Sequence, residues 1–399
     1  MKIAIISEGF HGSTLALAGS LCETNYVDIL FLMGLRGRLN NFEAFSSPQK
    51  IPLFIPQKID LNNASGISFI KNKENLSIHV WKNKFERTGI FKILSNLNLK
   101  YCNYKLKKYD FVIVIGQSKY MSDLSVILQK AGIPNIHTFH EICFKGTKEI
   151  LNTVNEVLMA GIPTLTHSEY LYKKLQEIYP QHDKNIHCIP MGAFLGYKDF
   201  NHDKQVILEL LPNEDYVLSY GYIEPYKGYD QLWNLYIDLK NKHRLNFKFV
   251  IAGTGKNPYV DRMKNNEDFI VINRWLDNDD LATLIAHSSL IICTYNRASQ
   301  SGIPLTAFCF NKLVLATNVG AFSEEIQNGI NGYVCDDMIQ MESHLTALMN
   351  KHNDLNKNIV IHKCSYSNEN NWDNIGKMYD KLFNDIMNKK NILKDVLQN

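Results

Sequence analysis

The sequence predicts an α/β protein made of two doubly wound domains, each a parallel sheet with helices on both faces. Three observations support this prediction: short apolar runs recur along the chain, helical patterns separate several of them, and the alternation pauses near residue 200 before it restarts. Apolar runs without polar alternation are typical of strands buried on both faces, as in parallel sheets covered by helices.

The N-terminal half supplies the first set of predicted strands. Their sequences are KIAIIS from Lys2, VDILFL from Val27, FVIVIG from Phe111, IHTF from Ile136, TLTHS from Thr164 and IHCIP from Ile186. Apolar residues at helical spacing predict helices over 120–131 and 168–179. The start, MKIAIISEGFHG, has one lysine and a short apolar core, so it indicates a first strand rather than a signal peptide.

The second half repeats the alternation after a break around residues 191–204 that contains Gly and Asp. Its predicted strands are YVLSYG, FKFVIAG, FIVI, LIICT and LVLAT, and its predicted helices cover about 228–243, 278–287 and 339–350. We therefore expect an N-terminal domain at 1–198 and a C-terminal domain at 199–384. The amphipathic tail leaves open that a last helix, about 385–399, packs back on the first domain.

The composition narrows the classes of function. The chain has 399 residues, 45% of them hydrophobic and 21% charged, with a formal net charge of only +3, so no nucleic-acid partner is expected. Its eight cysteines lack the close pairs of zinc or redox motifs, which suits buried thiols in a reducing cytoplasm. No run approaches the roughly 18 apolar residues of a membrane span. We expect a cytoplasmic protein.

The loops that follow strands are the candidate site, because open parallel sheets bind ligands at the carboxyl ends of their strands. In SYGYIEPYKGYDQL a strand ends at Gly221, and Lys227 precedes Gly228 and a helix. The helix dipole disfavours a lysine there unless an anion such as phosphate lies between them. Without its context, the same Lys-Gly pair would indicate a solvent-exposed turn.

Two further loops in the second half are less specific. Gly253 and Gly255 in IAGTGKNPY fit a tight turn with close backbone approach, since the third glycine and the acidic residue of a dinucleotide fingerprint are missing. Arg274 follows the strand FIVI, and Asp277 and Asp280 then suit an N-cap and a first helical turn. Capping explains these acids better than metal binding does, and we expect no metal site.

The stretch YNRASQSGIPLTAF, between LIICT and LVLAT, contains no carboxylate and only one cation. Gly302, with Ser299, Gln300 and Ser301 before it, would let the backbone approach a ligand while the next helix points N–H groups at it. Pro304 fits the first turn of that helix, where its missing donor costs nothing. The pattern predicts a backbone cradle for an anion, although a plain strand-to-helix turn has the same composition.

The N-terminal half offers SEGFHGST after its first strand and HTFHEICFKG after the strand near residue 138. Because side chains alternate along a strand, His137 and His140 point to opposite faces and do not converge on a metal. His140 lies at the strand's end, where a ligand could reach it. A single histidine is also often a structural side chain, and the residues alone leave both interpretations open.

Taken in order, the C-terminal motifs from Gly221 to YNRASQSG, followed by ATNVGAFSEEIQNGINGYV, resemble a retaining glycosyltransferase of family 4. Their order and spacing are more specific than any one motif. HSEYLYKKL and IHCIPMGAF extend the resemblance upstream. It implies the GT-B fold, in which two Rossmann-like domains face a cleft. The C-terminal domain would hold a nucleotide-sugar donor and the N-terminal domain the acceptor.

The resemblance also implies roles for single residues. Lys227 matches the lysine that grips the donor diphosphate, Arg274 would supply a second cation, and His140 falls where the family has a histidine facing the transferred sugar. These three are the implied catalytic residues. The implied donor-binding residues are Gly12, Ser13, Gly221, Lys227, Gly253, Arg274, Ser299, Gln300, Ser301, Gly302 and Ile303. Gly320 and Glu324 match a glycine and a glutamate near the phosphates.

The chain departs from the family at two places. An arginine commonly follows the first glycine of the lysine motif, and this chain has Tyr222 there. The family's paired glutamates would fall at Ser299 and Ala307, and neither residue is acidic. The second glutamate normally holds the ribose, so another group must make that contact. The sequence resembles a branch of the family with QSG at this corner.

The resemblance implies an enzyme that moves a hexose from a UDP- or GDP-linked donor to a glycan or lipid-linked glycan, in surface polysaccharide synthesis. It implies no cofactor and no metal, since cations and N–H groups would stabilise the leaving diphosphate, which itself takes the acceptor's proton. The alternative is a noncatalytic nucleotide-sugar-binding protein that kept the fold and lost the glutamates. A nucleotide-sugar epimerase is less favoured, because no acids and bases are predicted to converge on the sugar.

Residues 81–109 are strongly basic. They contain eight Lys and Arg residues against Glu86 alone, with Phe91, Leu94, Leu97 and Tyr101 at helical spacing. Basic amphipathic helices lie on anionic membranes, so the segment predicts peripheral binding at the inner face of the membrane. A helix that packs on its own domain, with a solvated basic face, is the alternative.

Overall fold

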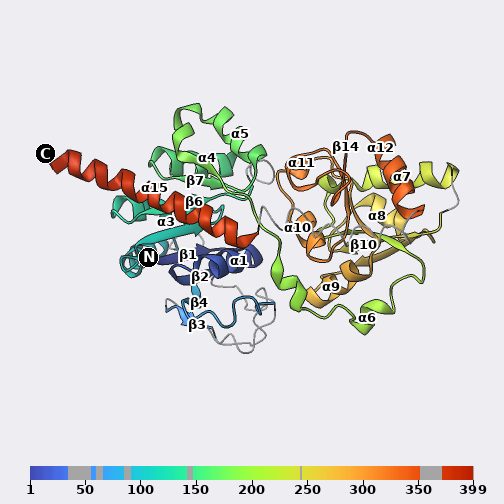
Figure 1. Cartoon of the computed structure of the whole chain (residues 1–399), viewed down its shortest axis with the longest axis horizontal. Coiled ribbons are helices and arrows are strands. Elements are labelled where there is room, and N and C mark those ends of the chain that lie inside the picture. Colours follow the sequence, from blue (N-terminus) through green and yellow to red (C-terminus); the bar gives the residue numbers. More distant parts are fainter. Residues whose placement is uncertain are drawn as a thin grey trace. The chain divides into compact units, whose positions relative to one another are not determined.

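The structure is a computed structural model that describes residues 1–34, 55–59, 66–84, 91–141, 147–242, 245–350 and 371–398 (Figure 1). The chain forms two compact units, Met1–Gly192 with Asn370–Asn399, and Ala193–Glu369. The division between them falls a few residues before the expected 198/199. The C-terminal segment joins the first unit from residue 370, whereas the sequence suggested this for about 385–399.

One long helix, α15 (Trp372–Gln398), brings the chain back to the first unit, where it lies along α1 (His11–Leu21) (Figure 1). The Ser20 hydroxyl donates a hydrogen bond to the carbonyl of Trp372, in the first turn of α15. One turn later, a side chain at Gly376 would clash with the Ser20 hydroxyl, which would lie 2.1 Å from the new Cβ. The two helices therefore pack closely from the first turn of α15.

The first unit contains an eight-stranded sheet in the order β3-β4-β2-β1-β5-β6-β7-β8. Its strands are β1 (Lys2–Ser7), β2 (Tyr26–Gly34), β3 (Gln57–Lys58), β4 (Leu76–Lys84), β5 (Phe111–Ile115), β6 (Asn135–Thr138), β7 (Thr164–Thr166) and β8 (Ile186–Cys188). The strands pair in parallel, except that β3 is antiparallel to β4 at the edge. The remaining helices are α2 (Phe91–Leu106), α3 (Lys119–Lys130), α4 (Thr147–Met159), α5 (Glu169–Ile178) and η3 (Pro180–Asn185).

The second unit contains a six-stranded parallel sheet in the order β11-β10-β9-β12-β13-β14. Its strands are β9 (Tyr216–Tyr220), β10 (Lys248–Gly253), β11 (Phe269–Asn273), β12 (Leu290–Cys293), β13 (Val314–Thr317) and β14 (Gly332–Cys335). Its helices are η4 (Leu195–Asp199), α6 (Gln205–Leu208), η5 (Pro225–Lys227), α7 (Tyr229–Lys242), α8 (Pro258–Met263), α9 (Asn278–His287), α10 (Gly302–Cys309), α11 (Phe322–Glu325) and α12 (Met338–Asn350).

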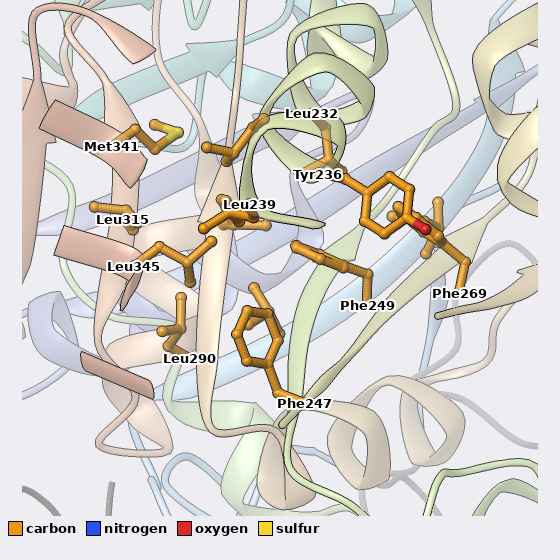
Figure 2. Packing of buried hydrophobic residues seen from close by; sticks show 14 of the residues in the cluster. Leu232, Tyr236, Leu239, Phe247, Phe249, Phe269, Leu290, Leu315, Met341 and Leu345 are labelled. Carbon is orange, nitrogen blue, oxygen red and sulfur yellow. The ribbon is translucent and has the colours of Figure 1, made fainter. Parts of the chain in front are cut away.

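Apolar side chains of the strands and of the helices that cover them form the core of the second unit (Figure 2). The rings of Phe249 on β10 and Phe269 on β11 stack with centroids 5.1 Å apart, and Tyr236 of α7 meets Phe269 edge-on at 4.9 Å. Leu239 of the same helix and Leu345 of α12 complete the packing on this face. This core fixes the sheet whose strand ends carry the candidate site.

Each sheet reverses its strand order once. In the first unit the reversal lies between the neighbouring strands β1 and β5, because the strands that follow each of them are added on opposite sides. In the second unit it lies between β9 and β12 for the same reason. Such a reversal is where doubly wound sheets bind ligands, beside the carboxyl ends of the two central strands. The predicted class, α/β with two doubly wound domains, is confirmed. No helix within the described ranges is both long and apolar enough to cross a bilayer.

Candidate functional site

The lysine loop is locked onto the end of β12. Lys227 closes η5, and the next residue, Gly228, has φ +67°, a left-handed conformation that favours glycine. A Cβ at Gly228 would lie 1.7 Å from the carbonyl oxygen of Thr294. The Thr294 hydroxyl lies 3.2 Å from the carbonyl oxygen of Lys227 and 3.0 Å from that of Gly228. Only a glycine lets the loops after β9 and β12 meet in this way.

The Lys227 side chain is held between these two loops. It is 5% exposed, and its Nζ donates to the carbonyl of Tyr220 at 2.8 Å and to the hydroxyl of Tyr295 at 2.7 Å. The Tyr295 ring centroid lies 4.8 Å from Nζ. Burial lowers the pKa of Lys227 to about 8. An ammonium has three N–H donors, so one remains for a further acceptor beyond these two described partners.

Tyr295 connects Lys227 to the start of α10. It is buried, which raises the pKa of its hydroxyl, while the nearby Ser301 side chain lowers it in part. Ser301 is the N-cap of α10, and its hydroxyl accepts a hydrogen bond from the N–H of Ile303 at 3.3 Å. The structure therefore brings together two predicted groups, Lys227 and the corner around Ser301. Tyr295 was not predicted, because an aromatic residue after a strand has the same pattern as a core residue.

The corner before α10 is held by the turn that follows β13. The N–H of Ala321 donates to the carbonyl of Ser299 at 3.1 Å. Gly320 has φ +59°, and a Cβ there would lie 2.1 Å from the carbonyl oxygen of Ala298. Ser299 itself is 2% exposed. The turn after β13 thus fixes the backbone of Ser299. The first turn of α10, which follows shortly after, therefore starts from a fixed position.

The structure gives the expected glycines packing roles within the second unit. A Cβ at Gly302 would lie 2.7 Å from the Phe194 ring, at the start of this unit. Gly253 has φ +148°, and a Cβ there would lie 1.8 Å from the carbonyl oxygen of Gly221. A Cβ at Gly255 would lie 2.2 Å from the Ile223 carbonyl oxygen, so the loops after β9 and β10 touch through their backbones.

Arg274 lies at the end of β11, and its guanidinium is engaged in the cap of α9. It donates to Oδ2 of Asp280, and Nζ of Lys204 contacts the other carboxyl oxygen, Oδ1, at 2.6 Å. Burial would raise the pKa of Asp280, but the hydrogen bonds from Arg274 and Lys204 lower it. Asp277 and Asp280 form a capping box, as the sequence predicted. The expected second cation is therefore paired with Asp280 in the structure.

His140 lies at the end of β6 in the first unit and stacks on a neighbouring aromatic ring. Its ring centroid is 3.7 Å from that of Phe10 and 4.7 Å from that of His167. Burial, and then His167, lower its pKa well below the usual value, so the imidazole is neutral. Nε2 has no hydrogen-bond partner in the described part of the chain. Phe10 is also the N-cap of α1.

Gly12 and Ser13 lie in the first turn of α1, after the end of β1. The Ser13 hydroxyl donates to the Phe10 carbonyl at 3.0 Å, and a Cβ at Gly12 would meet no atom of the described residues within 4 Å. The ring of Phe10, the N-cap of α1, thus links His140 to the start of the helix that contains both residues. Packing against the described residues therefore does not require a glycine at Gly12.

Glu8 was not among the predicted site residues. It follows β1 and lies where the first sheet reverses its strand order, between β1 and β5. Its carboxylate accepts hydrogen bonds from the N–H of Gln117 at 2.9 Å and of Ser118 at 2.8 Å, and from the Ser118 hydroxyl at 2.6 Å. These donors lie at the N-terminus of α3, where an anion is favoured. A side chain of the chain itself therefore takes the anion position in the first unit. No cluster of three or more His, Cys, Asp or Glu side chains that could hold a metal occurs among the described residues.

Comparison with known proteins supports the assignment of the fold. The family model described as "Glycosyl transferases group 1" matches residues 201–361, which lie in the second unit. No curated protein sequence matches the chain significantly. Among solved structures, the sucrose-phosphate synthase of Thermosynechococcus elongatus aligns with TM-score 0.68 and 13% identity over 98% of this chain and 100% of that one.

Two further solved structures agree. The catalytic domain of starch synthase IV from Arabidopsis thaliana, bound to ADP and acarbose, aligns with TM-score 0.65 and 14% identity over 96% of this chain and 99% of that one. A glycosyltransferase from Rickettsia africae aligns with TM-score 0.64 and 17% identity over 97% and 98% of the two chains. The chain has the GT-B fold of glycosyltransferases, and its residues 201–361 match glycosyl transferases group 1.

Proposed function

We propose that the protein is a glycosyltransferase that takes a sugar from a nucleotide-sugar donor held by the second unit. The observation that supports this most directly is the contact of Lys227 with Tyr295, beside the N-terminus of α10. It lies where the sheet reverses, in the segment that matches the glycosyltransferase family. A buried ammonium and the N–H groups of a helix start are complementary to a diphosphate.

In the proposed reaction, the bond between the sugar and the nucleoside diphosphate breaks, and negative charge grows on the diphosphate. Lys227 and the backbone N–H of Gly302, the first residue of α10, would stabilise that charge, because they are fixed before the reaction begins. Each hydrogen bond to a charged group contributes about 1.5–3 kcal/mol net. We propose a retaining reaction without a metal, in which the leaving phosphate takes the acceptor's proton. His140, with Gly12 and Ser13, would contact the sugar from the first unit.

The donor is proposed to be a UDP- or GDP-linked hexose. One aligned structure, Anabaena HepE, was solved in complex with UDP and glucose, and the starch synthase structure contains ADP. HepE aligns with TM-score 0.60 and 13% identity, so its likeness to this chain is one of fold. The ribose contact is assigned to the polar corner Ser299, Gln300 and Ser301, since Ala307 offers no carboxylate there.

The acceptor is proposed to be a glycan or lipid-linked glycan of a surface polysaccharide, reached at the inner face of the membrane. Residues 85–90 of the basic segment, and the side chains of 82–96, lie outside the described residues. In the rest of α2, Leu97 is 58% and Tyr104 69% exposed, and Lys100 and Lys105 are exposed beside them. Co-sedimentation with anionic liposomes at low salt tests this surface, and a protein that stays in solution would contradict it.

A thermal-shift panel of nucleotide sugars, followed by assays of donor turnover, tests the proposed function. A ligand at 100 times its dissociation constant should raise the free energy of unfolding by about 2.7 kcal/mol. Lys227→Ala should reduce the shift and abolish donor-dependent transfer or hydrolysis. A shift without turnover would favour the alternative, a noncatalytic nucleotide-sugar-binding protein. The ion pair of Arg274 with Asp280 favours that alternative, because one expected cation is already paired within the protein.

A further inference from the structure

Phe10 adopts a backbone conformation that a phenylalanine rarely takes. It lies between β1 and α1 with φ +55° and ψ +40°, in the left-handed region. Within the described ranges, the other residue besides glycine with a positive φ is Asn311, a type that tolerates it. Backbone strain of this kind persists where the surroundings impose it and collects at functional sites, so the conformation of Phe10 needs a reason.

Burial of the Phe10 side chain does not supply that reason, because the residue is 43% exposed. Its ring stacks on the imidazole of His140, with the centroids 3.7 Å apart and the planes 18° from parallel. The same imidazole lies 4.7 Å from the ring of His167. The loop beside Phe10 is open, since a Cβ at Gly9 or Gly12 would meet no atom of the described residues within 4 Å. The strained residue therefore makes its ring contact with His140.

The chain on either side of Phe10 is fixed. On one side, the Glu8 carboxylate accepts hydrogen bonds from the N-terminus of α3. On the other side, the N–H of Thr14 and the hydroxyl of Ser13 both donate to the Phe10 carbonyl at 3.0 Å. These contacts hold the left-handed conformation in place and with it the position of the ring.

His140 differs from its neighbour on β6 in how its nitrogens are paired. Both ring nitrogens of His137 are engaged, with the Ser125 hydroxyl at 2.8 Å and the Gly116 carbonyl at 2.8 Å. His140 is 6% exposed, and its Nε2 has no hydrogen-bond partner in the described part of the chain. A buried nitrogen of this kind is costly unless a ligand pairs with it. Since Nε2 gives the imidazole no anchor, ring stacking contributes to holding its plane.

We propose that Phe10 is a positioning residue, whose ring keeps the imidazole of His140 in the orientation in which Nε2 pairs with a hydroxyl group of the transferred sugar. The inference rests on the proposed function, in which His140 contacts that sugar. It adds Phe10, which lies outside the set predicted from the sequence and acts through His140. The left-handed backbone is the feature that brings the ring onto the imidazole.

Chemical modification of the ligand-free, full-length protein tests the contact between the two rings. Diethyl pyrocarbonate acylates neutral imidazole, and mass spectrometry gives the rate at His140 at pH 7. Phe10→Ala should raise that rate about two- to tenfold, as expected for the loss of one aromatic pair. Phe10→Tyr keeps the ring and should stay within about twofold of the original protein. Phe10→Leu keeps the apolar bulk without a flat ring and should also raise the rate, which provides a second variant if Phe10→Ala folds poorly.

His137 is the internal control for these rates. It is fully buried with both nitrogens engaged, so it should remain unreactive in every variant. Tyr26→Ala is the matched control variant, because Tyr26 is a 65% exposed aromatic residue of the same unit and should leave the rate at His140 unchanged. An unchanged rate at His140 in Phe10→Ala would overturn the inference. A parallel rise at His137 would also overturn it, because it would indicate a general loosening of the fold.

Kinetics test the role in the reaction, with UDP-glucose and GDP-mannose as the donors. Phe10→Ala should lower kcat for donor turnover about tenfold, because His140 is no longer held in place. The affinity for free UDP or GDP should stay within about twofold, since the nucleotide has no sugar for His140 to contact. Phe10→Tyr should restore kcat. A residue that only supports the fold would not separate kcat from nucleotide affinity in this way.

The same measurements distinguish the inference from the proposed function. If the original protein turns over neither donor, the proposed function fails and the role of Phe10 in the reaction fails with it. If the original protein turns over a donor and Phe10→Ala has the same kcat, only the role of Phe10 is lost. A fall in kcat that Phe10→Tyr reverses, with nucleotide affinity retained, supports both.

Discussion

The ammonium of Lys227 donates a hydrogen bond to the hydroxyl of Tyr295, with 2.7 Å between Nζ and the phenolic oxygen. Lys227 follows β9 and Tyr295 follows β12, the two neighbouring strands at which the second sheet reverses its order. The contact therefore joins the two loops that a ligand at this edge of the sheet would touch. It also keeps a buried cation paired within the protein before any ligand is present.

Lys227 should make nucleotide binding depend on pH. Burial lowers its pKa to about 8, so UDP affinity should fall as pH rises from 7 to 9, when the free protein loses this charge. Since the second pKa of a phosphate is about 6, the charge on the diphosphate changes little over this range, and ADP, whose base does not ionise there, serves as the second ligand. Titrations at several pH values measure the slope, and Lys227→Met should abolish it. An equal slope in that variant would assign the dependence to another group.

The same pKa predicts how stability changes with pH. The folded protein releases the Lys227 proton at about pH 8, whereas the unfolded chain holds it up to the ordinary lysine pKa of 10.5. Because the unfolded state binds more protons between these values, this group's contribution to the free energy of unfolding rises with pH there. Urea unfolding at pH 7.5 and 9.5 measures it. The increase should be smaller in Lys227→Met, which has no proton to lose.

Tyr295→Phe should shift the pH dependence as well as weaken binding. The ring remains, but the ammonium loses a hydrogen-bond acceptor that favours its charged form, so the pKa of Lys227 should fall further. The decline in UDP affinity should then begin at a lower pH. We also expect a loss of about 1–3 kcal/mol in the free energy of unfolding.

Tyr236→Phe provides the control for this substitution. It removes a buried hydroxyl that donates to Asp268 at 3.0 Å. Asp268 precedes the strand β11, whereas Lys227 and Tyr295 follow their strands. It should lower stability without moving the pH dependence of UDP binding. An identical shift of that dependence in both variants would contradict the role of Tyr295.

The parts of the site that the sequence predicted are those fixed by backbone rules. A buried strand followed by Lys227-Gly228, and a second followed by small residues and Pro304, each require a turn at a strand end. Parallel pairing then places such ends at one edge of the sheet. The strand β4, LSIHVWKNK, was missed because its polar and apolar residues alternate, and β14 is only four residues long.

The parts that could not be predicted depend on contacts between distant segments. Nothing in the sequence distinguishes Tyr295 from a core tyrosine until β9 and β12 are neighbours. Glu8 contacts residues 117 and 118, more than 100 positions away. Such pairings are set by tertiary structure rather than by local pattern.

Arg274→Ala should separate a capping role from a ligand-binding role. The guanidinium donates to Asp280, which is 1% exposed, so its removal should lower the free energy of unfolding by about 1–3 kcal/mol. Lys204 keeps one hydrogen bond to the same carboxylate, which limits the loss. UDP affinity should change less than about twofold if Arg274 has a capping role alone, because its guanidinium is already paired with Asp280. A tenfold loss of affinity would restore Arg274 to the diphosphate site.

Gly228→Ala should be among the most destabilising single-methyl substitutions in the second unit. The new Cβ would lie 1.7 Å from the Thr294 carbonyl oxygen, at a backbone φ of +67°. Left-handed strain costs about 1–2 kcal/mol, and the clash requires the loops after β9 and β12 to separate, so we expect a total of about 3 kcal/mol or more. Gly329→Ala is the matched control, with φ +78° and its nearest contact 4.0 Å away at the Tyr333 hydroxyl. It should show the strain alone in urea unfolding, and equal losses in the two variants would mean that the loops are not locked together at Gly228.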